Sequence, residues 1–515
     1  MGEAKWTHEQ WDAITARNGN LLVAAAAGAG KTAVLVERII RRITDPEDPV
    51  DIDRLLIVTF TNAAAAEMRE RIGAAVSRAL EENPGSKHLQ RQLILLNRAH
   101  ITTIHSFCLE VIRNNFQLLD IDPNFRVADE TEAVLMKWEV LNRLFEEIYE
   151  EEDQDPVFYD LLDCYGGNKD DQALQEIVME LYNFIQSSPW PEKWLIEMTE
   201  SYHQAGEEDF GTTPWGQVLL DTVFLELSGM KEMMERGISL LLEAHGTERN
   251  LALFREELSF IESLQRICRQ ENGARWDSLC RKVREVEFDR LHPAGKNTDR
   301  EKHDQAKKLR DEMKERMRKI REEICTADSR EIWQDFTTLY PLVKCLAQLV
   351  AKFSACYREK KSRKGIVDFN DLEHFCLEIL NNPAGPVPAY REHFQEIYVD
   401  EYQDSNLVQE FIINLISRVD AGTPNIFMVG DVKQSIYRFR QAKPELFLEK
   451  YRRYAREEGN PYRKILLYKN FRSRKNILDG VNFIFKQIMS QRVGELDYTD
   501  AEALDAGAVF AAAPP

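Results

Sequence analysis

The sequence predicts an α/β fold in which a parallel sheet is interrupted by a large all-helical insertion. Short apolar runs that end in polar residues and lead into helices occur early and late in the chain, as in parallel sheets. Between residues 129 and 364, helical periodicity replaces these strand signals. At 515 residues the chain is too long for one core, so several domains are expected.

Composition narrows the class of protein. With 43% hydrophobic and 30% charged residues, the chain is typical of globular proteins. We expect no apolar run long enough to cross a bilayer and no signal peptide. The eight cysteines are scattered, which predicts reduced thiols. Together these features predict a cytoplasmic protein. The net charge of −20 argues against nonspecific nucleic-acid binding, but total charge does not exclude a local DNA-binding channel.

The first strand signal leads into a candidate phosphate-binding loop, in the stretch LLVAAAAGAGKTAVLVERIIRR at 21–42. Small residues let backbone N–H groups surround a polyphosphate at a helix N-terminus, here Ala25, Ala26, Ala27, Gly28, Ala29 and Gly30. Lys31 would reach the β- and γ-phosphates, and Thr32 would hold Mg²⁺. Ala25 replaces the usual first glycine, which requires a negative φ there. Two glycines before Lys31 disfavour the alternative, an alanine-rich buried strand with a turn.

Gln10 lies in a helix just before this loop and has two interpretations. With Thr7 as N-cap, Gln10 occupies the N3 position of a capping box. Its amide could instead read the edge of adenine, because it offers both a donor and an acceptor. The sequence leaves both open.

Two further strands end in polar residues suited to nucleic-acid contacts. Leu55–Phe60 is followed by Thr61 and Asn62, which could cap the next helix or bond a nucleic-acid backbone. The strand beginning at Ile101 leads to His105 and Ser106, for which phosphate contact is a better interpretation than nucleophilic chemistry. A lone histidine is more often a satisfied core group.

A late strand ends in two adjacent carboxylates, Asp400 and Glu401. In a P-loop enzyme such a pair divides two tasks, so Asp400 would bind the metal and Glu401 would orient and deprotonate the attacking water. Adjacent acids are common on protein surfaces, so this pair is moderate evidence by itself. The phosphate-loop pattern around Lys31 strengthens the interpretation of the pair as a metal and water site. The structure should therefore place Lys31 beside these acids.

The last motif, GDVKQSIYRFR at 430–440, follows another strand. Gln434 could sense the γ-phosphate, and Phe439 between two arginines suits stacking on single-stranded bases. Core packing is the alternative for Phe439.

Within the helical region, an apolar seam predicts packing inside the insertion, and a projecting docking arm is the alternative. The seam comprises Ala306, Leu309, Met313, Met317, Ile320 and Ile324.

In this order the segments resemble the motifs of superfamily 1 helicases of the UvrD/Rep kind. The residues of these motifs are most similar to those of the AddA family of bacterial AddAB helicase–nucleases, and the similarity extends over nearly the whole chain to about Tyr498. The segments that carry the resemblance are VAAAAGAGKTAVLVERII, VTFTNAAAAEM, ITTIHSFC, DFNDLEHFCLEIL, VDEYQDSNLVQE, MVGDVKQSIYRFR and KNFRSRKNILD.

The resemblance implies a P-loop NTPase (RecA-like) fold and an ATP-dependent DNA helicase that uses Mg²⁺. Gln10 and Phe471 would bracket the adenine. The triphosphate and Mg²⁺ would be served by Lys31, Thr32, Asp400, Glu401, Gln434 and Arg472, and the DNA track lined by Thr61, Asn62, His105, Ser106 and Phe439. The family translocates 3′ to 5′ on single strands, acts on duplex ends in recombinational repair, has exonuclease activity and pairs with an AddB subunit.

The resemblance also implies a domain order. We expect the first part of a motor domain at 1–128, a helical insertion at 129–364, the second part of that motor at 365–460, and the start of a second motor domain with an alanine-rich tail at 461–515. Family members continue well beyond this length, so the chain is expected to be a fragment that hydrolyses ATP poorly by itself. The alternatives are a UvrD/Rep-type repair helicase, a non-motor DNA-dependent ATPase and a binding-only subunit.

Overall fold

The computed structural model describes residues 6–150, 155–165, 171–203, 208–271, 273–508 and 510. They form two compact units: one comprises 1–154, 166–194 and 349–515, and the other 155–165 and 195–348. The first contains the large sheet and the second is helical. The four-part domain order stays a prediction, and residues 509 and 511–515 of the alanine-rich tail lie outside the described residues.

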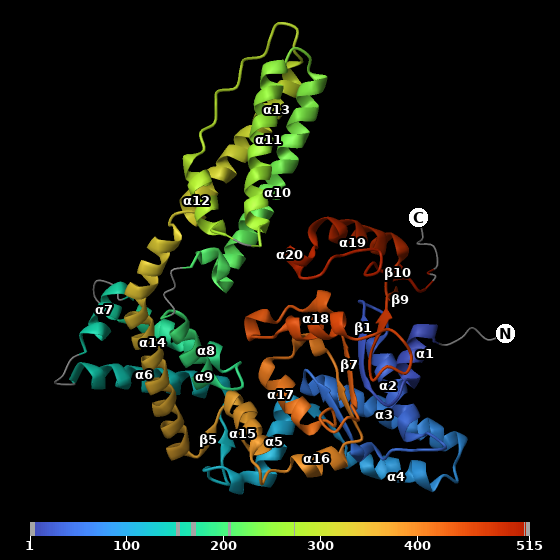
Figure 1. Ribbon diagram of the computed structural model, residues 1–515. Coiled ribbons are helices and arrows are strands. Elements are labelled where there is room, and N and C mark those ends of the chain that lie inside the picture. Colours follow the sequence, from blue (N-terminus) through green and yellow to red (C-terminus); the bar gives the residue numbers. More distant parts are fainter. Residues whose placement is uncertain are drawn as a thin grey trace. The chain divides into compact units, whose positions relative to one another are not determined.

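Within the described residues, six parallel strands form one sheet in the order β3-β2-β6-β7-β1-β8 (Figure 1). Their bounds are β1 Asn20–Ala25, β2 Leu55–Thr59, β3 His100–Thr103, β6 Glu396–Val399, β7 Ile426–Gly430 and β8 Tyr462–Leu467. The predicted parallel α/β fold is therefore confirmed. Since all strands run the same way, the polar residues that follow them meet at one edge.

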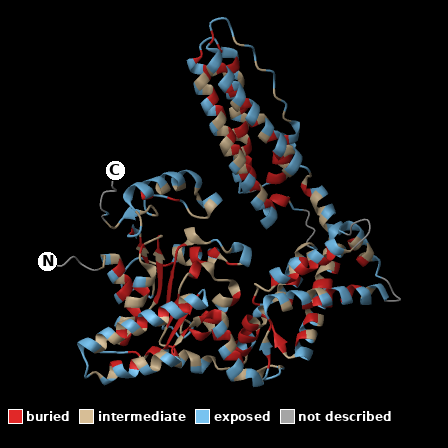
Figure 2. Ribbon diagram, turned by 180° about the vertical axis from the view of Figure 1, so that it is seen from behind, coloured by how far each residue is buried: buried red, intermediate tan, exposed pale blue. Residues whose placement is uncertain are grey.

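Helices cover both faces of this sheet. Neighbouring residues of a strand point to opposite faces, so Leu21 and Val23 belong to one apolar core and Leu22 to the other. The first core is closed by α1 His8–Thr15, α2 Lys31–Ile43, α3 Asn62–Glu82 and α4 Lys87–Leu95. The second is closed by α5 Ile104–Asn115, α15 Phe369–Asn381, α17 Leu407–Ile416 and α18 Pro444–Arg453. Figure 2 shows the buried strands between these exposed helix surfaces.

Smaller elements complete this unit. Two short parallel pairs join β4 to β5 and β9 to β10. The bounds are β4 Arg126–Val127, β5 Ile366–Val367, β9 Lys469–Asn470, β10 Asp505–Ala506, α6 Glu130–Glu150, α8 Gln172–Ile185, α16 Val387–His393, α19 Lys475–Ile488 and α20 Gln491–Gly494. The strand after the expected boundary at residue 461 is β8, which pairs with β1 in the large sheet.

The helical unit has its own core. It contains α7 Pro156–Tyr165, α10 Pro214–Glu243, α11 Glu248–Arg269, α12 Arg275–Glu285 and α13 Arg300–Lys319, and α9 Pro191–Ser201 and α14 Ser329–Lys364 cross its boundary. Ala306, Met313 and Met317 of the apolar seam are buried in this core. Packing inside the insertion, the preferred interpretation of the seam, is thus confirmed.

The hydropathy expectation needs one correction. Within the described residues, α14 contains an 18-residue window with a mean hydropathy of 1.2 and at most two charged residues, of which 22% is buried. By length and composition this helix could cross a membrane, so the expectation that no run is long enough is wrong. One such helix is weak evidence for a membrane span, because core helices of soluble proteins meet the same criteria.

Candidate nucleotide and nucleic-acid site

The loop between β1 and α2 has the backbone that a phosphate cradle requires. Gly28 and Gly30 adopt left-handed φ angles of 69° and 82°. A Cβ on Gly28 would lie 2.7 Å from Asn470 Nδ2, so a side chain would also collide there. Ala25 ends β1 in extended backbone, which meets the condition for replacing a glycine.

A buried carboxylate fixes the helix that carries Lys31. Glu396 opens β6 and pairs with Arg38 Nη2 at 3.1 Å and Arg42 Nε at 2.9 Å, both on α2. Burial raises the pKa of Glu396, but Arg38, the Tyr398 hydroxyl and Arg42 outweigh burial and hold this pKa below its usual value. Helix α2 is thereby tied to β6, the strand that ends at the paired acids.

At the other end of β6, Lys31 Nζ lies 2.9 Å from Glu401 Oε2. This confirms the predicted proximity of the loop lysine and the acids, which are 370 residues apart in the chain. Glu401 has φ 50° and ψ 44°. A residue with a Cβ adopts this left-handed conformation at a cost of about 1–2 kcal/mol, and outliers of this kind cluster at functional sites.

Two further acids crowd this edge. Asp400 Oδ1 accepts a hydrogen bond from the Glu401 backbone N–H at 3.0 Å. Burial, and then the charge of Glu401, raise the pKa of Asp400 to about 6. The same two causes raise the pKa of Asp404 to about 6. Three carboxylates facing Lys31 leave excess negative charge, which suits a divalent cation.

The donor set fits Mg²⁺ held jointly with a nucleotide. Asp400 and the half-buried Thr32, the second residue of α2, offer the oxygen ligands that Mg²⁺ prefers. Within the described ranges, no group of three or more His, Cys, Asp or Glu side chains is arranged to hold a metal. Mg²⁺ would therefore need phosphate oxygens and water to complete its shell, as is usual for this ion.

Gln403, which the sequence patterns did not single out, joins the acids to the next strand. Its Nε2 donates to Glu401 Oε2 at 2.9 Å and Asp404 Oδ2 at 3.1 Å. Its Oε1 accepts from the Asp431 backbone N–H at 3.0 Å. Asp431 Oδ2 in turn accepts from Gln434 Nε2 at 2.7 Å.

These bonds form a continuous chain from Lys31 to Gln434. Gln403 is only 2% exposed. A Cβ on Gly430 would lie 2.3 Å from Gln403 Oε1, so the glycine that ends β7 makes room for this amide. The position of Gln403 two residues after Glu401 was the one available signal, but its partners on the next strand could not be read from it.

Gln10 forms the capping hydrogen bond of its helix and also contacts the phosphate loop. Its Oε1 accepts from the Thr7 backbone N–H and its Nε2 donates to Ala29 O, both at 3.0 Å. The capping box is therefore present. Recognition of adenine by Gln10 stays a prediction.

The segment after β8 also lies against the loop. Asn470 Nδ2 donates to Ala27 O at 2.6 Å, and the Phe471 backbone N–H donates to Gly28 O at 2.9 Å. The Phe471 ring is 38% exposed, and Arg472 is exposed beside it. Contact of Phe471 with adenine and of Arg472 with the triphosphate stays a prediction. Asn470, which positions the segment, was missed.

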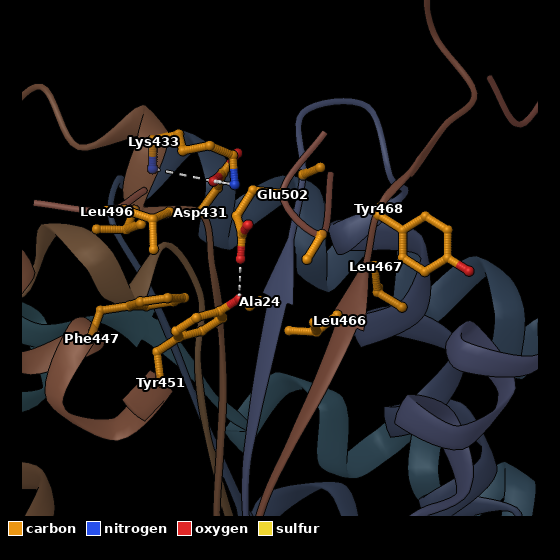
Figure 3. A pocket seen from close by; sticks show the side chains of 13 residues that line it. Ala24, Asp431, Lys433, Phe447, Tyr451, Leu466, Leu467, Tyr468, Leu496 and Glu502 are labelled. Atoms are coloured by element: carbon orange, nitrogen blue, oxygen red, sulfur yellow. Dashed lines mark hydrogen bonds and ion pairs between the residues drawn. The ribbon is translucent and has the colours of Figure 1, made fainter. Parts of the chain in front are cut away.

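Figure 3 shows a cavity beside this segment, at the ends of β1, β7 and β8. Lys433 Nζ pairs with Asp431 Oδ1 at 2.9 Å, and the Tyr451 hydroxyl donates to Glu502 Oε1 at 2.9 Å. The cavity volume of about 30 Å³ is far below the roughly 300–1,000 Å³ of a typical ligand pocket. It is therefore too small to be the nucleotide site.

The predicted DNA-contacting residues lie after β2 and β3. Thr61 Oγ1 caps α3 by accepting from the Ala64 N–H at 3.1 Å, and Asn62 is exposed beside it. Ser106 Oγ lies 3.0 Å from Thr103 Oγ1. His105 Nε2 lies 3.2 Å from Glu373 Oε1. Contacts of these residues with DNA stay predictions.

Three aromatic rings, of which Phe60 and Phe439 are exposed and Tyr437 is half-buried, cluster on the same unit. Phe439 is 74% exposed, so the core-packing alternative is wrong. Phe60 stacks on Tyr437 with a centroid distance of 4.8 Å, and Tyr437 lies 5.9 Å from Phe439. The Arg440 guanidinium lies 5.7 Å from the Phe439 ring centre. We call Phe60, Tyr437 and Phe439 the aromatic platform; its first two members were missed because their proximity is tertiary.

A small cavity connects the two sets of residues. Its volume is about 60 Å³. Its lining includes Phe60 and His105 from the candidate DNA side, Asp400 and Glu401 from the candidate nucleotide side, and Gln409 from the first turn of α17. The two candidate sites therefore border one common cavity.

Comparison with known proteins agrees with this geometry. Residues 6–455 match the model of the UvrD/REP helicase N-terminal domain. The chain is 59% identical over 98% of its length to an ATP-dependent helicase/nuclease subunit of Acetivibrio thermocellus. It is 57% identical over 99% of its length to the protein of the same name from Ruminiclostridium cellulolyticum. In both comparisons it spans 41% of the relative's length.

Proposed function

Because this chain belongs to the UvrD/REP helicase family, we propose that it binds and hydrolyses ATP as the motor portion of a DNA helicase subunit. The observation that carries the proposal is the 2.9 Å contact between Lys31 of the phosphate loop and Glu401 after β6. It brings the phosphate-binding and water-activating groups of a P-loop enzyme to one sheet edge.

The wider role that we propose combines the relatives' name with what the resemblance to the AddA family implies. The whole protein would be the helicase subunit of an ATP-dependent helicase–nuclease, moving 3′ to 5′ on single strands from duplex ends during recombinational repair. It would act in the cytoplasm with an AddB-type partner, and exonuclease activity would accompany unwinding. Within it, 1–128 and 365–460 would form one motor domain around the helical insertion at 129–364, and the chain from 461 would add β8 to the sheet of that motor before it leads into a second motor domain.

Each residue of the site has a proposed task in ATP hydrolysis. The loop amides and Lys31 bind the phosphates, and Thr32 with Asp400 holds Mg²⁺, which when bound neutralises phosphate charge. Glu401 accepts the proton of the attacking water. Gln434 and Arg472 contact the γ-phosphate, and Gln10 and Phe471 contact the adenine.

The Lys31–Glu401 pair implies an order of events. The Lys31 ammonium carries one positive charge, and a bound γ-phosphate carries more negative charge than the Glu401 carboxylate, so the phosphate would compete with Glu401 for Lys31. ATP would therefore replace Glu401 as the partner of Lys31. This exchange leaves Glu401 available as a base, and Gln403 keeps its carboxylate at the site through the 2.9 Å hydrogen bond.

DNA binding is proposed to rest on stacking. The net charge of −20 disfavours a mainly phosphate-driven contact, whereas the exposed platform rings suit stacking on successive bases. A non-motor P-loop ATPase, the second candidate, would have no use for such a platform.

Lys31→Ala tests the nucleotide assignment. Removing one group that stabilises transition-state charge lowers turnover by at least about 100-fold in other enzymes, and we expect that loss here. ATP turnover and binding of a fluorescent ATP analogue would be measured with and without single-stranded DNA. Lys475→Ala, on exposed α19, is the matched control. Equal turnover in Lys31→Ala and wild type would refute the assignment.

A further inference from the structure

Glu373 is a buried carboxylate within DFNDLEHF, a segment to which the proposed chemistry assigns no role. It lies on α15 and is 5% exposed. In the described structure it faces three polar side chains: His105 Nε2 at 3.2 Å, Asn406 Nδ2 at 3.1 Å and Gln409 Nε2 at 2.8 Å. The last two bonds satisfy both carboxylate oxygens.

These partners come from two parts of the sheet edge. His105 begins α5 beyond β3, on the candidate DNA side. Asn406 is the N-cap of α17 and accepts from the Gln409 N–H at 2.8 Å, so both belong to the first turn of that helix. This turn follows the acids Asp400 and Glu401 along the chain.

The arrangement is tight enough to transmit a displacement. Burial raises the pKa of Glu373, but the hydrogen bonds and charge of His105, with those of Gln409 and Asn406, keep it below its usual value. A buried carboxylate that loses a partner incurs a desolvation cost. His105 and the first turn of α17 therefore share one buried carboxylate, and loss of the His105 contact would leave Glu373 held by that turn alone. The ring of Phe369, edge-on to His105 at 5.6 Å, restricts the alternatives.

We propose that Glu373 is a positioning residue that orients His105 toward single-stranded DNA and couples its engagement to the first turn of α17, beside the carboxylates that act on ATP. The inference rests on the proposed function, since it takes His105 as a DNA contact. The shared cavity lined by His105, Gln409 and Glu401 is the place where the two sides meet.

Glu373→Gln is the test, because it preserves shape and removes charge. Hydrogen–deuterium exchange would be followed in peptides covering 103–110 and 404–412, with and without a single-stranded oligonucleotide. In the wild-type chain we expect DNA to slow exchange in both peptides. In Glu373→Gln we expect slowing at 103–110 only, and an oligonucleotide affinity lowered about three- to tenfold.

Two further variants keep the test decisive. Glu378→Gln, an exposed acid on the same helix, should behave as wild type. Gln409→Met removes one donor but leaves Glu373, and should also lose the response at 404–412; it carries the test if Glu373→Gln does not fold. A merely structural role would change the melting temperature without separating the two peptides.

The outcomes are distinguishable. If wild type binds the oligonucleotide but Glu373→Gln keeps the response at 404–412, the coupling is refuted and the proposed function stands. If wild type binds no single-stranded DNA, the proposed DNA function fails and the inference fails with it. If His105→Ala binds DNA as wild type does, the orienting role of Glu373 is refuted.

Discussion

Two charge clusters, one in each unit, are built in opposite ways. In the helical unit Arg310 is 2% exposed and Glu257 6% exposed, and they pair one to one, with Arg310 Nε 2.8 Å from Glu257 Oε2. Arg310 Nη2 also donates to Asp289 O at 2.7 Å. At the sheet edge, by contrast, Asp400, Glu401 and Asp404 crowd around Lys31.

The difference separates a structural charge cluster from a functional one. A matched, fully hydrogen-bonded ion pair is neutral as a whole and needs no ligand to balance its charge. Burial, and then the charge of Glu401, raise the pKa of Asp400 and of Asp404, and such perturbed groups concentrate at sites that bind or react. The two clusters should therefore respond with opposite signs when one charge is removed from each.

Removing the acid of the matched pair should give the largest effect. Glu257→Gln leaves a buried guanidinium without its carboxylate, which costs about 3–5 kcal/mol of unfolding free energy. Urea unfolding followed by tryptophan fluorescence would measure it, with exposed Glu256→Gln as control. Binding of the ATP analogue should be unchanged. A loss as small as that of the control would show that the matched pair is not structural.

At the sheet edge, removing an acid should stabilise the fold. Between its usual pKa of 3.8 and about 6, folded Asp400 binds more protons than unfolded Asp400, so unfolding free energy falls as pH rises through this window. Asp400→Asn should therefore gain about 2–3 kcal/mol at pH 7, gain little at pH 4, and lose Mg²⁺-dependent hydrolysis. Urea unfolding at both pH values checks the sign. Destabilisation at pH 7 would contradict it.

The two units can also be compared by their exposed aromatic rings, with Phe439 on the sheet-containing unit and Trp215 on the helical unit. Phe439→Ala removes a stacking surface worth about 1–3 kcal/mol per base, so oligonucleotide affinity should fall about tenfold. Trp215, 37% exposed in the helical unit, is the control, since Trp215→Ala should leave affinity unchanged. Fluorescence anisotropy measures both. Equal affinities for Phe439→Ala and wild type would favour the non-motor ATPase.

A more modest effect is expected for Gln403→Met. The amide holds Glu401 and the Asp431 loop without contacting ATP, so kcat should fall about fivefold, which is about 1 kcal/mol, and ATP affinity should stay within twofold. Steady-state hydrolysis over a range of ATP concentrations separates the two constants. Gln270→Met, at an exposed position of the helical unit, is the control. A change in affinity alone would contradict the positioning role.

Local patterns predicted much of this molecule because their signals lie within short stretches. The strands around Ile57 and Val429, the loop before Lys31 and the acids after Val399 each combine an apolar run with a characteristic turn. The helical seam around Met313 follows from its spacing. Gln403, Asn470 and Glu373 could not be found this way, since a buried amide or carboxylate acquires its role from partners tens or hundreds of residues away.

The parallel α/β fold, the glycine-rich phosphate loop and the pair of acids could be read from the chain before folding, because apolar periodicity and backbone geometry act over a few residues. Folding was needed to establish which other groups meet: Gln403 with Asp431, Asn470 with Ala27, and His105 with Glu373. The strand order that brings these pairs together is set by packing of the whole sheet, whose free energy is shared by residues from the entire chain.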